Sequence, residues 1–331
     1  MRTKILYVVV CDETHSYIEQ AAISAYSVKY YNPSADIVLL VDNKTNNLIT
    51  SSRGLIKSIV SDIIVVPIPK EFDSRMASRY IKTTARKWIE GDYLFIDTDT
   101  VICQDLSNID KFDGDIGAVL DLHVTLDKSG YLAMVEKQAK AMSWSLSEKD
   151  FNYFNSGVMF VKDSQVAHAL YEKWHQSWKL KAKLGLYTDQ PALAYANNQC
   201  GFIIKELGGA WNCQLFVNGF PYFNEAKIIH YFSSSVNKRA KISPYYFSSL
   251  DLLDVIKREQ KFPDDFLTYI ESPKCKAFPA CKTKIVSGED YDLFVSDVIE
   301  FVYSQYYYYP KRFAVIKCLV DLYYKLKRII K

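Results

Sequence analysis

Short apolar runs alternate with segments of helical spacing along most of the chain, up to about residue 230. Runs rich in β-branched and aliphatic residues predict strands at residues 4–10, 36–41, 63–66, 92–96, 116–120, 157–161 and 227–229. Apolar residues spaced three and four apart predict helices at residues 17–31, 78–89, 131–146, 165–183 and 190–196. This alternation predicts an α/β fold whose sheet is built largely of parallel strands.

The pattern changes near residue 243, where it becomes irregular and then helical. We therefore expect two parts, residues 1–242 and a mainly helical C-terminal region of residues 243–331. With 49% apolar and 24% charged residues in a chain of 331, the composition is that of an ordered protein with a sizeable core.

Polar side chains lie at the ends of five predicted strands. Asp42, Asp97 and Asp121 follow strands directly, Asp12 follows one after Cys11, and Asn155 adjoins another strand. Because functional groups in parallel sheets gather beyond the carboxyl ends of the strands, we expect a site at this edge.

Asp97-Thr98-Asp99 is the strongest local signal for chemistry. Side chains alternate along an extended backbone, so both carboxylates fall on the same side. Paired carboxylates of this kind bind Mg²⁺ or Mn²⁺, and such an ion can bridge a diphosphate and neutralise its charge. The same pattern is also frequent by chance at solvated strand ends, so the motif alone leaves both interpretations open.

The net charge of +3 is unevenly distributed along the chain. Residues 311–331 contain seven Lys or Arg and one Asp, a balance of +6, so the rest of the chain carries −3. This division argues against a uniformly basic nucleic-acid-binding surface, and we expect no nucleic-acid partner.

The basic C-terminal segment has the spacing of an amphipathic helix. One face carries five apolar residues: Ile316, Leu319, Tyr323, Leu326 and Ile330. The opposite face carries four charged residues: Lys317, Asp321, Lys325 and Arg328. We expect this helix to bind an anionic membrane surface, with packing against the protein body or a second subunit as the alternative.

Cysteine usage and the N-terminal sequence both bear on the compartment. The seven cysteines are scattered without paired metal-ligand spacing, which is typical of free thiols in a reducing compartment. The apolar run before Cys11 and Asp12 is too short for a signal peptide or a spanning helix. We therefore expect a cytoplasmic protein that is peripheral on the inner face of the membrane.

Several motifs together resemble the retaining galactosyl- and glucosyltransferases of glycosyltransferase family eight and their bacterial relatives. In chain order they are SRYIKTTARKWIEGDYLFIDTDTVI, GAVLDLH, FNSGVMFV, YTDQPAL and KIIHYF. The resemblance covers roughly residues 4 to 235. It implies a GT-A fold, with a Rossmann-like mixed and mostly parallel sheet, and transfer of a hexose from a nucleoside-diphosphate sugar with retention of configuration.

The resemblance also implies a metal site and a catalytic pair. Asp97, Asp99 and His230 match the metal ligands, and an imidazole beside two carboxylates favours Mn²⁺ over Ca²⁺, with Mg²⁺ as the other option. Asp189 and Gln190 match the pair beside the reacting carbon. On its own, Asp189 before Pro191 would more often serve as a helix N-cap, and the two roles can coexist.

Further residues match positions that contact the donor. Arg79 and Lys82 match basic positions near the diphosphate or sugar, and Asp12 matches the nucleotide-binding corner. Asp121 and Asn155 match positions that hold the sugar hydroxyls. The family usually carries a glycine and a lysine after the metal histidine, whereas this chain has HYFSSSVNKRAK. Lys238 is our candidate for the pyrophosphate contact, with Arg239 as the substitute.

The leading hypothesis is a retaining transferase that moves a hexose from a UDP-sugar to a glycan or lipid-linked glycan acceptor in bacterial surface polysaccharide assembly. One alternative is a sugar nucleotidyltransferase, although no glycine-rich loop follows the first strand. The other is a non-catalytic sugar-binding relative, which would not need a complete metal site.

Overall fold

The structure is a computed structural model that describes residues 1–215, 218–231, 245–277 and 296–329. Lys238, Arg239 and Cys281 lie outside these described residues. The six cysteines within them are free thiols.

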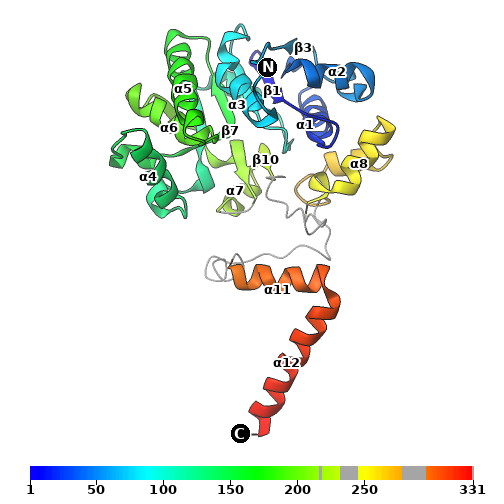
Figure 1. The fold of residues 1–331 in the computed structure, drawn as a ribbon. Helices are drawn as coiled ribbons and strands as arrows, with labels where there is room; N and C mark the ends of the chain where they lie inside the picture. Colours follow the sequence, from blue (N-terminus) through cyan, green and yellow to red (C-terminus); the bar gives the residue numbers. More distant parts are fainter. Residues whose placement is uncertain (216–217, 232–244, 278–295, 330–331) are drawn as a thin grey trace.

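A seven-stranded sheet forms the centre of the molecule (Figure 1). Its strands lie in the order β3-β2-β1-β4-β7-β6-β8. Their bounds are β1 Lys4–Val9, β2 Ile37–Val41, β3 Asp62–Val65, β4 Tyr93–Ile96, β6 Ile116–Leu120, β7 Phe154–Val161 and β8 Ile204–Glu206. Only β7 among these strands runs antiparallel to its neighbours, β4 and β6. The sheet is therefore mostly parallel, as the hydrophobic pattern predicts, and mixed, as the family resemblance implies.

Helices cover both faces of this sheet. The described helices of the chain, including those outside these layers, are α1 Tyr17–Tyr31, α2 Asn43–Ser51, α3 Ser74–Thr84, α4 Leu132–Ala141, α5 Gln165–Lys183, α6 Gln190–Gln199, α7 Phe220–Phe223, α8 Leu250–Glu259, α9 Phe266–Ile270, α11 Asp297–Tyr308 and α12 Pro310–Ile329. Side chains alternate along each strand, so Leu39 packs with the core on the α1 face and Leu40 with the core that includes Trp174 and Trp178 of α5. Burial on both faces explains the uninterrupted apolar sequence of β2.

A second, three-stranded sheet of β5 Thr100–Ile102, β10 Ile228–His230 and β9 Cys213–Gln214 lies beside the first. Four elements are not predicted from the sequence pattern: strands β5, β8 and β9 and helix α2. Each is too short or too polar to show a clear hydrophobic period. The predicted helix at 131–146 ends earlier, at Ala141. The helix before β4 begins earlier than predicted, because Asp73 caps it through the backbone N–H of Met76.

The C-terminal region has two dissimilar parts. Helices α8 and α9 share a core with the N-terminal part of the chain, in which Leu252 and Phe266 pack with Ile23 of α1. By contrast, α11 and α12 extend away from the body (Figure 1). Many of their apolar side chains are exposed, including Val298 at 68% and Leu319 at 62%. Within the described residues, no helix combines the length and hydrophobicity that crossing a membrane requires.

Candidate active site and metal centre

A cavity of about 650 Å³ opens at the carboxyl ends of β1 and β4. Most of the site residues that the sequence suggests line it: Asp12, Arg79, Lys82, Asp97, Asp99, Asn155, Asp189, Gln190 and His230. Asp121 does not line the cavity and lies behind Asn155, whose amide donates to its carboxylate at 2.8 Å. Asp42 contributes nothing to the cavity lining, because its side chain caps helix α2 through the N–H of Thr45.

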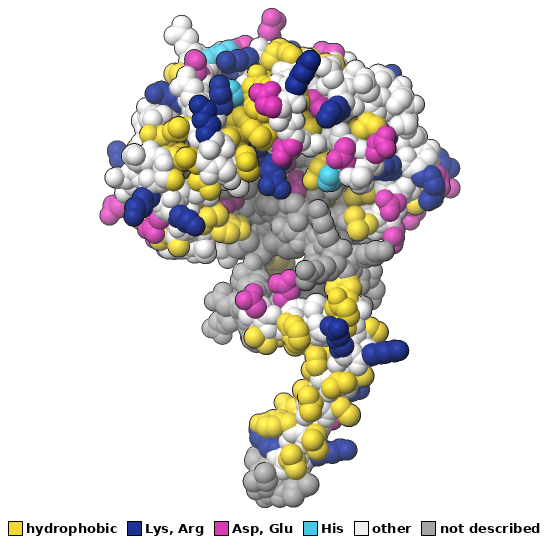
Figure 2. All heavy atoms as spheres, in the orientation of Figure 1, with side chains coloured by type: hydrophobic (Ala, Val, Ile, Leu, Met, Phe, Trp, Pro, Cys, Tyr) yellow, Lys and Arg dark blue, Asp and Glu magenta, His cyan; other side chains and the backbone are white. Residues whose placement is uncertain are grey.

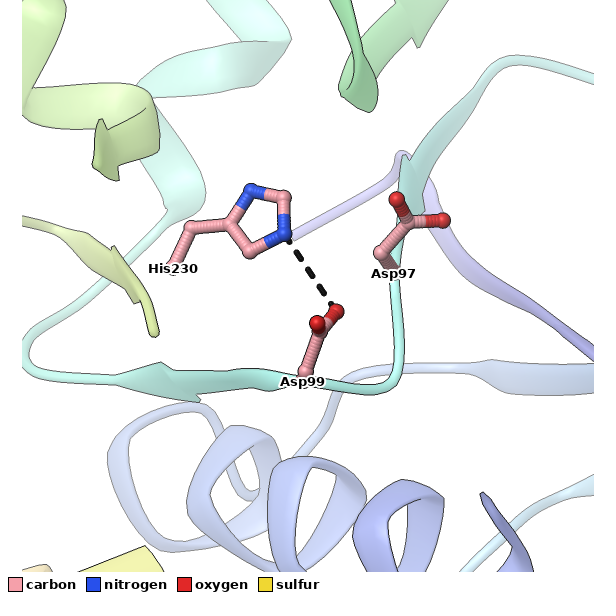
Figure 3. Close-up of side chains that lie close together, drawn as sticks. All are labelled: Asp97, Asp99 and His230. Atoms are coloured by element: carbon pink, nitrogen blue, oxygen red, sulfur yellow. Dashed lines mark ion pairs between the residues drawn. The ribbon is translucent and has the colours of Figure 1, made fainter. Parts of the chain in front are cut away.

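Asp97 and Asp99 converge with His230, although more than a hundred residues of sequence separate the two aspartates from the histidine. Each offers one ligand atom, and these atoms all lie within 4.8 Å of one another (Figure 3). The second sheet brings them together, because antiparallel pairing of β10 with β5 sets His230 opposite Thr100. His230 Nε2 lies 3.3 Å from Asp99 Oδ1.

The surroundings of this cluster fit a small divalent cation. Two carboxylates and one imidazole form a donor set that suits Mn²⁺ or Mg²⁺. Gly157 leaves the space open, since a Cβ there would lie 2.5 Å from His230 Cε1 and 2.8 Å from Asp97 Oδ2. Partial burial raises the pKa of the Asp97 carboxyl, and the neighbouring charge of Lys82 opposes this rise. A cation at this position would favour the ionised form of both carboxyls.

Asp189 forms a second charged group in the same cavity. It precedes α6 at the N-cap position, but its side chain makes no capping hydrogen bond. Its carboxylate instead lies 3.0 Å from Arg79 Nε and 3.4 Å from Lys82 Nζ, and it accepts from Ser156 Oγ at 3.1 Å. Burial opposes ionisation, yet Arg79 and Lys82 outweigh it and hold the pKa of Asp189 below its ordinary value. Asp189 is therefore a buried carboxylate that stays charged.

Lys82 links the two charged groups. Its side chain is only 5% exposed, and its ammonium lies 3.2 Å from Asp97 Oδ1 as well as 3.4 Å from Asp189 Oδ2. It also donates to Ser156 Oγ at 3.2 Å and lies over the ring of Phe95. The ammonium therefore makes two hydrogen bonds, to Asp97 and Ser156, and an ion pair with Asp189. Lys82 bridges the Asp97 and Asp189 carboxylates, and its proposed contact with the donor stays a prediction.

The loop after β1 is held by one buried arginine that sequence reasoning missed. Arg53 donates to both carboxylate oxygens of Glu19, to the Cys11 sulfur at 3.3 Å, and to the carbonyl oxygens of Asp12 at 3.0 Å and His15 at 2.9 Å. All five guanidinium protons therefore have acceptors. Arg53 lies in an irregular segment without a recognisable motif, so no local signal could have identified it.

Asp12, Tyr17 and His15 form the wall of the cavity beside β1. The Asp12 carboxylate accepts hydrogen bonds from the side chain and backbone of Thr14 and from His15, which lower its pKa. The rings of His15 and Tyr17 stack at 5.3 Å. Asp12 thus shapes its own loop, and Tyr17 adds an aromatic surface that the sequence analysis did not single out.

We compared the chain with protein families, with curated protein sequences and with solved structures. The sequence matches the family model described as glycosyl transferase family 8 over residues 8–238. No curated protein sequence matches the chain significantly. Among solved structures, the galactosyltransferase LgtC in complex with donor and acceptor sugar analogs has a TM-score of 0.50 at 14% identity, covering 80% of this chain and 99% of its own.

The bifunctional glycosyltransferase WbbM has a TM-score of 0.50 at 17% identity, covering 81% of this chain and 51% of its own. At these identities the two structures support the fold, which is of the GT-A type. The family match extends over more than half of the chain and includes every described residue of the cluster and of the Asp189 group. The chain belongs to glycosyl transferase family 8, and it is a glycosyltransferase.

Proposed function

We propose that this enzyme transfers a hexose from a nucleoside-diphosphate sugar, with UDP as the nucleotide, to a glycan or lipid-linked glycan acceptor with retention of configuration. The observation that carries the proposal is the presence of two charged groups in one cavity. The Asp97, Asp99 and His230 cluster suits a metal-bound diphosphate, and the ionised Asp189 lies beside it, joined through Lys82. We further propose a role in bacterial surface polysaccharide assembly.

In this proposal each part of the cavity has a separate task. When bound, Mn²⁺ or Mg²⁺ supplies positive charge that stabilises the departing diphosphate. Tyr17 provides an aromatic face for the base beside the loop that Asp12 shapes. Asn155 orients toward the sugar, with Asp121 behind it as its hydrogen-bond acceptor.

Asp189 has the chemistry that a retaining reaction needs near the reacting carbon. A carboxylate there can act as a nucleophile or stabilise positive charge that develops on the sugar ring. Gln190 follows it and also lines the cavity, and its Oε1 accepts from the backbone N–H of Ser156 at 3.4 Å. Arg79 and Lys82 fix the direction of the Asp189 carboxylate.

A panel of nucleotide sugars tests this function. Each is incubated with the protein and Mn²⁺ without acceptor, and release of the nucleoside diphosphate is measured. We expect one UDP-hexose to be hydrolysed faster than the others, and NMR of the sugar first released to show the anomer of the donor. Absence of hydrolysis and of binding across the whole panel, or release of the opposite anomer, would contradict the proposal.

Gly157→Ala tests the space around the metal. The added Cβ would overlap His230 Cε1 and the Asp97 carboxylate, so both ligands have to move. We expect Mn²⁺ affinity, measured by calorimetry, to fall by about tenfold or more, as when other neighbours of metal ligands are altered. Gly130→Ala is the control, because nothing lies within 4 Å of a Cβ at that position. Unchanged Mn²⁺ affinity in Gly157→Ala would argue against a metal at the cluster.

We also propose that the C-terminal helix α12 binds an anionic surface at the inner face of the bacterial membrane. Leu319, Tyr323 and Leu326 of its apolar face are each at least half exposed. Figure 2 shows hydrophobic and basic side chains together along the projecting helix. The balance of +6 in residues 311–331 complements anionic headgroups, each basic residue contributing about 1 kcal/mol near the surface. Ile330 of the expected apolar face lies outside the described residues.

Deletion of residues 311–331 tests the membrane proposal. The truncated protein carries −3, so we expect it to leave anionic vesicles in a flotation assay while it still transfers sugar to a small soluble acceptor. Binding of the full chain should weaken as ionic strength rises, because salt screens the attraction. Full-length chain on uncharged vesicles is the control. Flotation of the truncated protein equal to that of the full chain would contradict the prediction.

A further inference from the structure

A buried chain of hydrogen bonds connects His230 with Asp121. His230 Nδ1 lies 3.0 Å from Asn212 Oδ1, and Asn212 Nδ2 donates to Asn155 Oδ1 at 2.9 Å. Asn155 Nδ2 donates in turn to Asp121 at 2.8 Å. Asn212 is completely buried, although the sequence gives no reason to single it out.

A backbone N–H at one end of this series of hydrogen bonds determines which atom donates and which accepts in each of them. The N–H of Gly157 donates to Asn155 at 2.9 Å, so the atom that receives it has to be the amide oxygen. The same oxygen faces Asn212, which therefore presents its NH₂ group there. The other atom of the Asn212 amide is then its oxygen, and this oxygen faces His230 Nδ1. An amide oxygen only accepts, so the proton of the imidazole is on Nδ1.

This arrangement leaves the other ring nitrogen in the form that binds a metal. A neutral imidazole with its proton on Nδ1 carries a lone pair on Nε2. Nε2 is the nitrogen that lies 3.3 Å from Asp99 within the cluster (Figure 3). A metal-binding histidine normally donates its second N–H to a fixed acceptor, which sets both its tautomer and its ring orientation.

Strand pairing holds Asn212 rigidly relative to His230. Asn212 directly precedes β9, and Cys213 and Gln214 of β9 pair with Ile229 and His230 of β10. The turn before it is also hydrogen-bonded: the backbone N–H of Lys227 donates to the carbonyl of Ala210 at 2.8 Å, and the N–H of Trp211 donates to the carbonyl of Gly208 at 2.9 Å. The distance between Asn212 and the histidine is therefore set by backbone hydrogen bonds.

We propose that Asn212 is a positioning residue for the metal centre, which holds His230 in the Nδ1-protonated tautomer with Nε2 directed at the cluster. The inference rests on the proposed metal function of Asp97, Asp99 and His230. Asn212 acts through the imidazole and has no contact with the cation. Its amide also ties the orientation of His230 to that of Asn155, the residue proposed to face the donor sugar.

Two substitutions of Asn212 test whether His230 needs only the hydrogen-bond acceptor of this side chain or the whole amide group. Asn212→Asp keeps an oxygen that accepts from Nδ1–H, whereas Asn212→Ala removes it. With Mn²⁺ as the only ligand, calorimetric titration should show affinity about 10- to 100-fold weaker for Asn212→Ala. Asn212→Asp should stay much closer to the unmodified protein. Nitrogen NMR of labelled histidine should show the Nδ1–H tautomer of His230 in the unmodified protein and its loss in Asn212→Ala.

Asn197→Ala is the matched control. Asn197 is also buried, and its amide oxygen accepts from the N–H of Ile204 at 3.1 Å in a position outside the cavity lining. It should lower thermal stability and leave Mn²⁺ affinity unchanged. Wild-type affinity in Asn212→Ala, or equal loss in Asn212→Ala and Asn212→Asp, overturns the inference. If His230→Ala binds Mn²⁺ as well as the unmodified protein does, the metal proposal falls together with it.

Discussion

Replacing Asp189 by Asn lowers the turnover number by about a hundred- to a thousandfold and changes donor affinity much less. The expected size is that of losing one group directed at charge in a transition state. The carboxylate is buried and held charged by Arg79 and Lys82, so the substitution removes a negative charge from the cavity while preserving volume. Steady-state kinetics with the preferred donor, combined with donor titration, measures both quantities.

A purely structural role for Asp189 gives a different result. Asp150→Asn is the control, because Asp150 is a buried carboxylate that caps a turn and accepts from Asn198, outside the cavity. It should reduce the free energy of unfolding in urea and leave turnover per folded molecule unchanged. If Asp189→Asn behaves in the same way, with lower stability and normal turnover, Asp189 is not part of the reaction.

Replacing Asp99 by Asn or His230 by Ala should have an even larger effect on transfer. Each substitution removes one of three ligands whose atoms lie within 4.8 Å of one another. A metal contributes several kcal/mol to stabilising the leaving diphosphate, and each 1.36 kcal/mol corresponds to a factor of ten in rate. We therefore expect kcat/KM for the donor to fall by at least about a thousandfold.

Stability should change little in the Asp99 variant, since its carboxylate lies beyond the apolar part of β4. Thermal unfolding checks this directly. Asp105→Asn is the control, an acidic residue in the same region that accepts from Ser107 and lies outside the cavity lining. Full activity of the Asp99 and His230 variants would rule out their role as ligands.

Much of the fold follows from the hydrophobic pattern. The strands that the pattern predicts within the main sheet are those with uninterrupted apolar runs, such as β2 and β4, whose every residue is buried. The antiparallel direction of β7 is not predictable in this way, because strand direction depends on pairing between segments far apart in sequence. Strands β5 and β9 are not predictable either, because they are only three and two residues long and are defined by their pairing with β10.

The site shows the same division between local and long-range information. Asp97 and Asp99 are recognisable from their spacing after an apolar strand, whereas His230 is connected to them only through the family resemblance and the pairing of β5 with β10. Lys82 looks like a residue on a solvated helix face, yet it is buried between two carboxylates. Asn212 and Arg53 have no sequence signal, since their roles come entirely from tertiary contacts.

The most direct test of the central claim is the metal dependence of donor hydrolysis by the unmodified full chain. The protein is stripped with a chelator, the rate with the preferred nucleotide sugar is measured, and Mn²⁺ or Mg²⁺ is then added back in steps. We expect hydrolysis to stop in the chelator and to return with saturable dependence on the added ion. The Asp99→Asn protein should fail to recover at the same concentrations. Two results would contradict a metal-dependent transferase centred on Asp97, Asp99 and His230. One is hydrolysis that continues undiminished in the chelator, and the other is recovery of the Asp99→Asn protein equal to that of the unmodified chain.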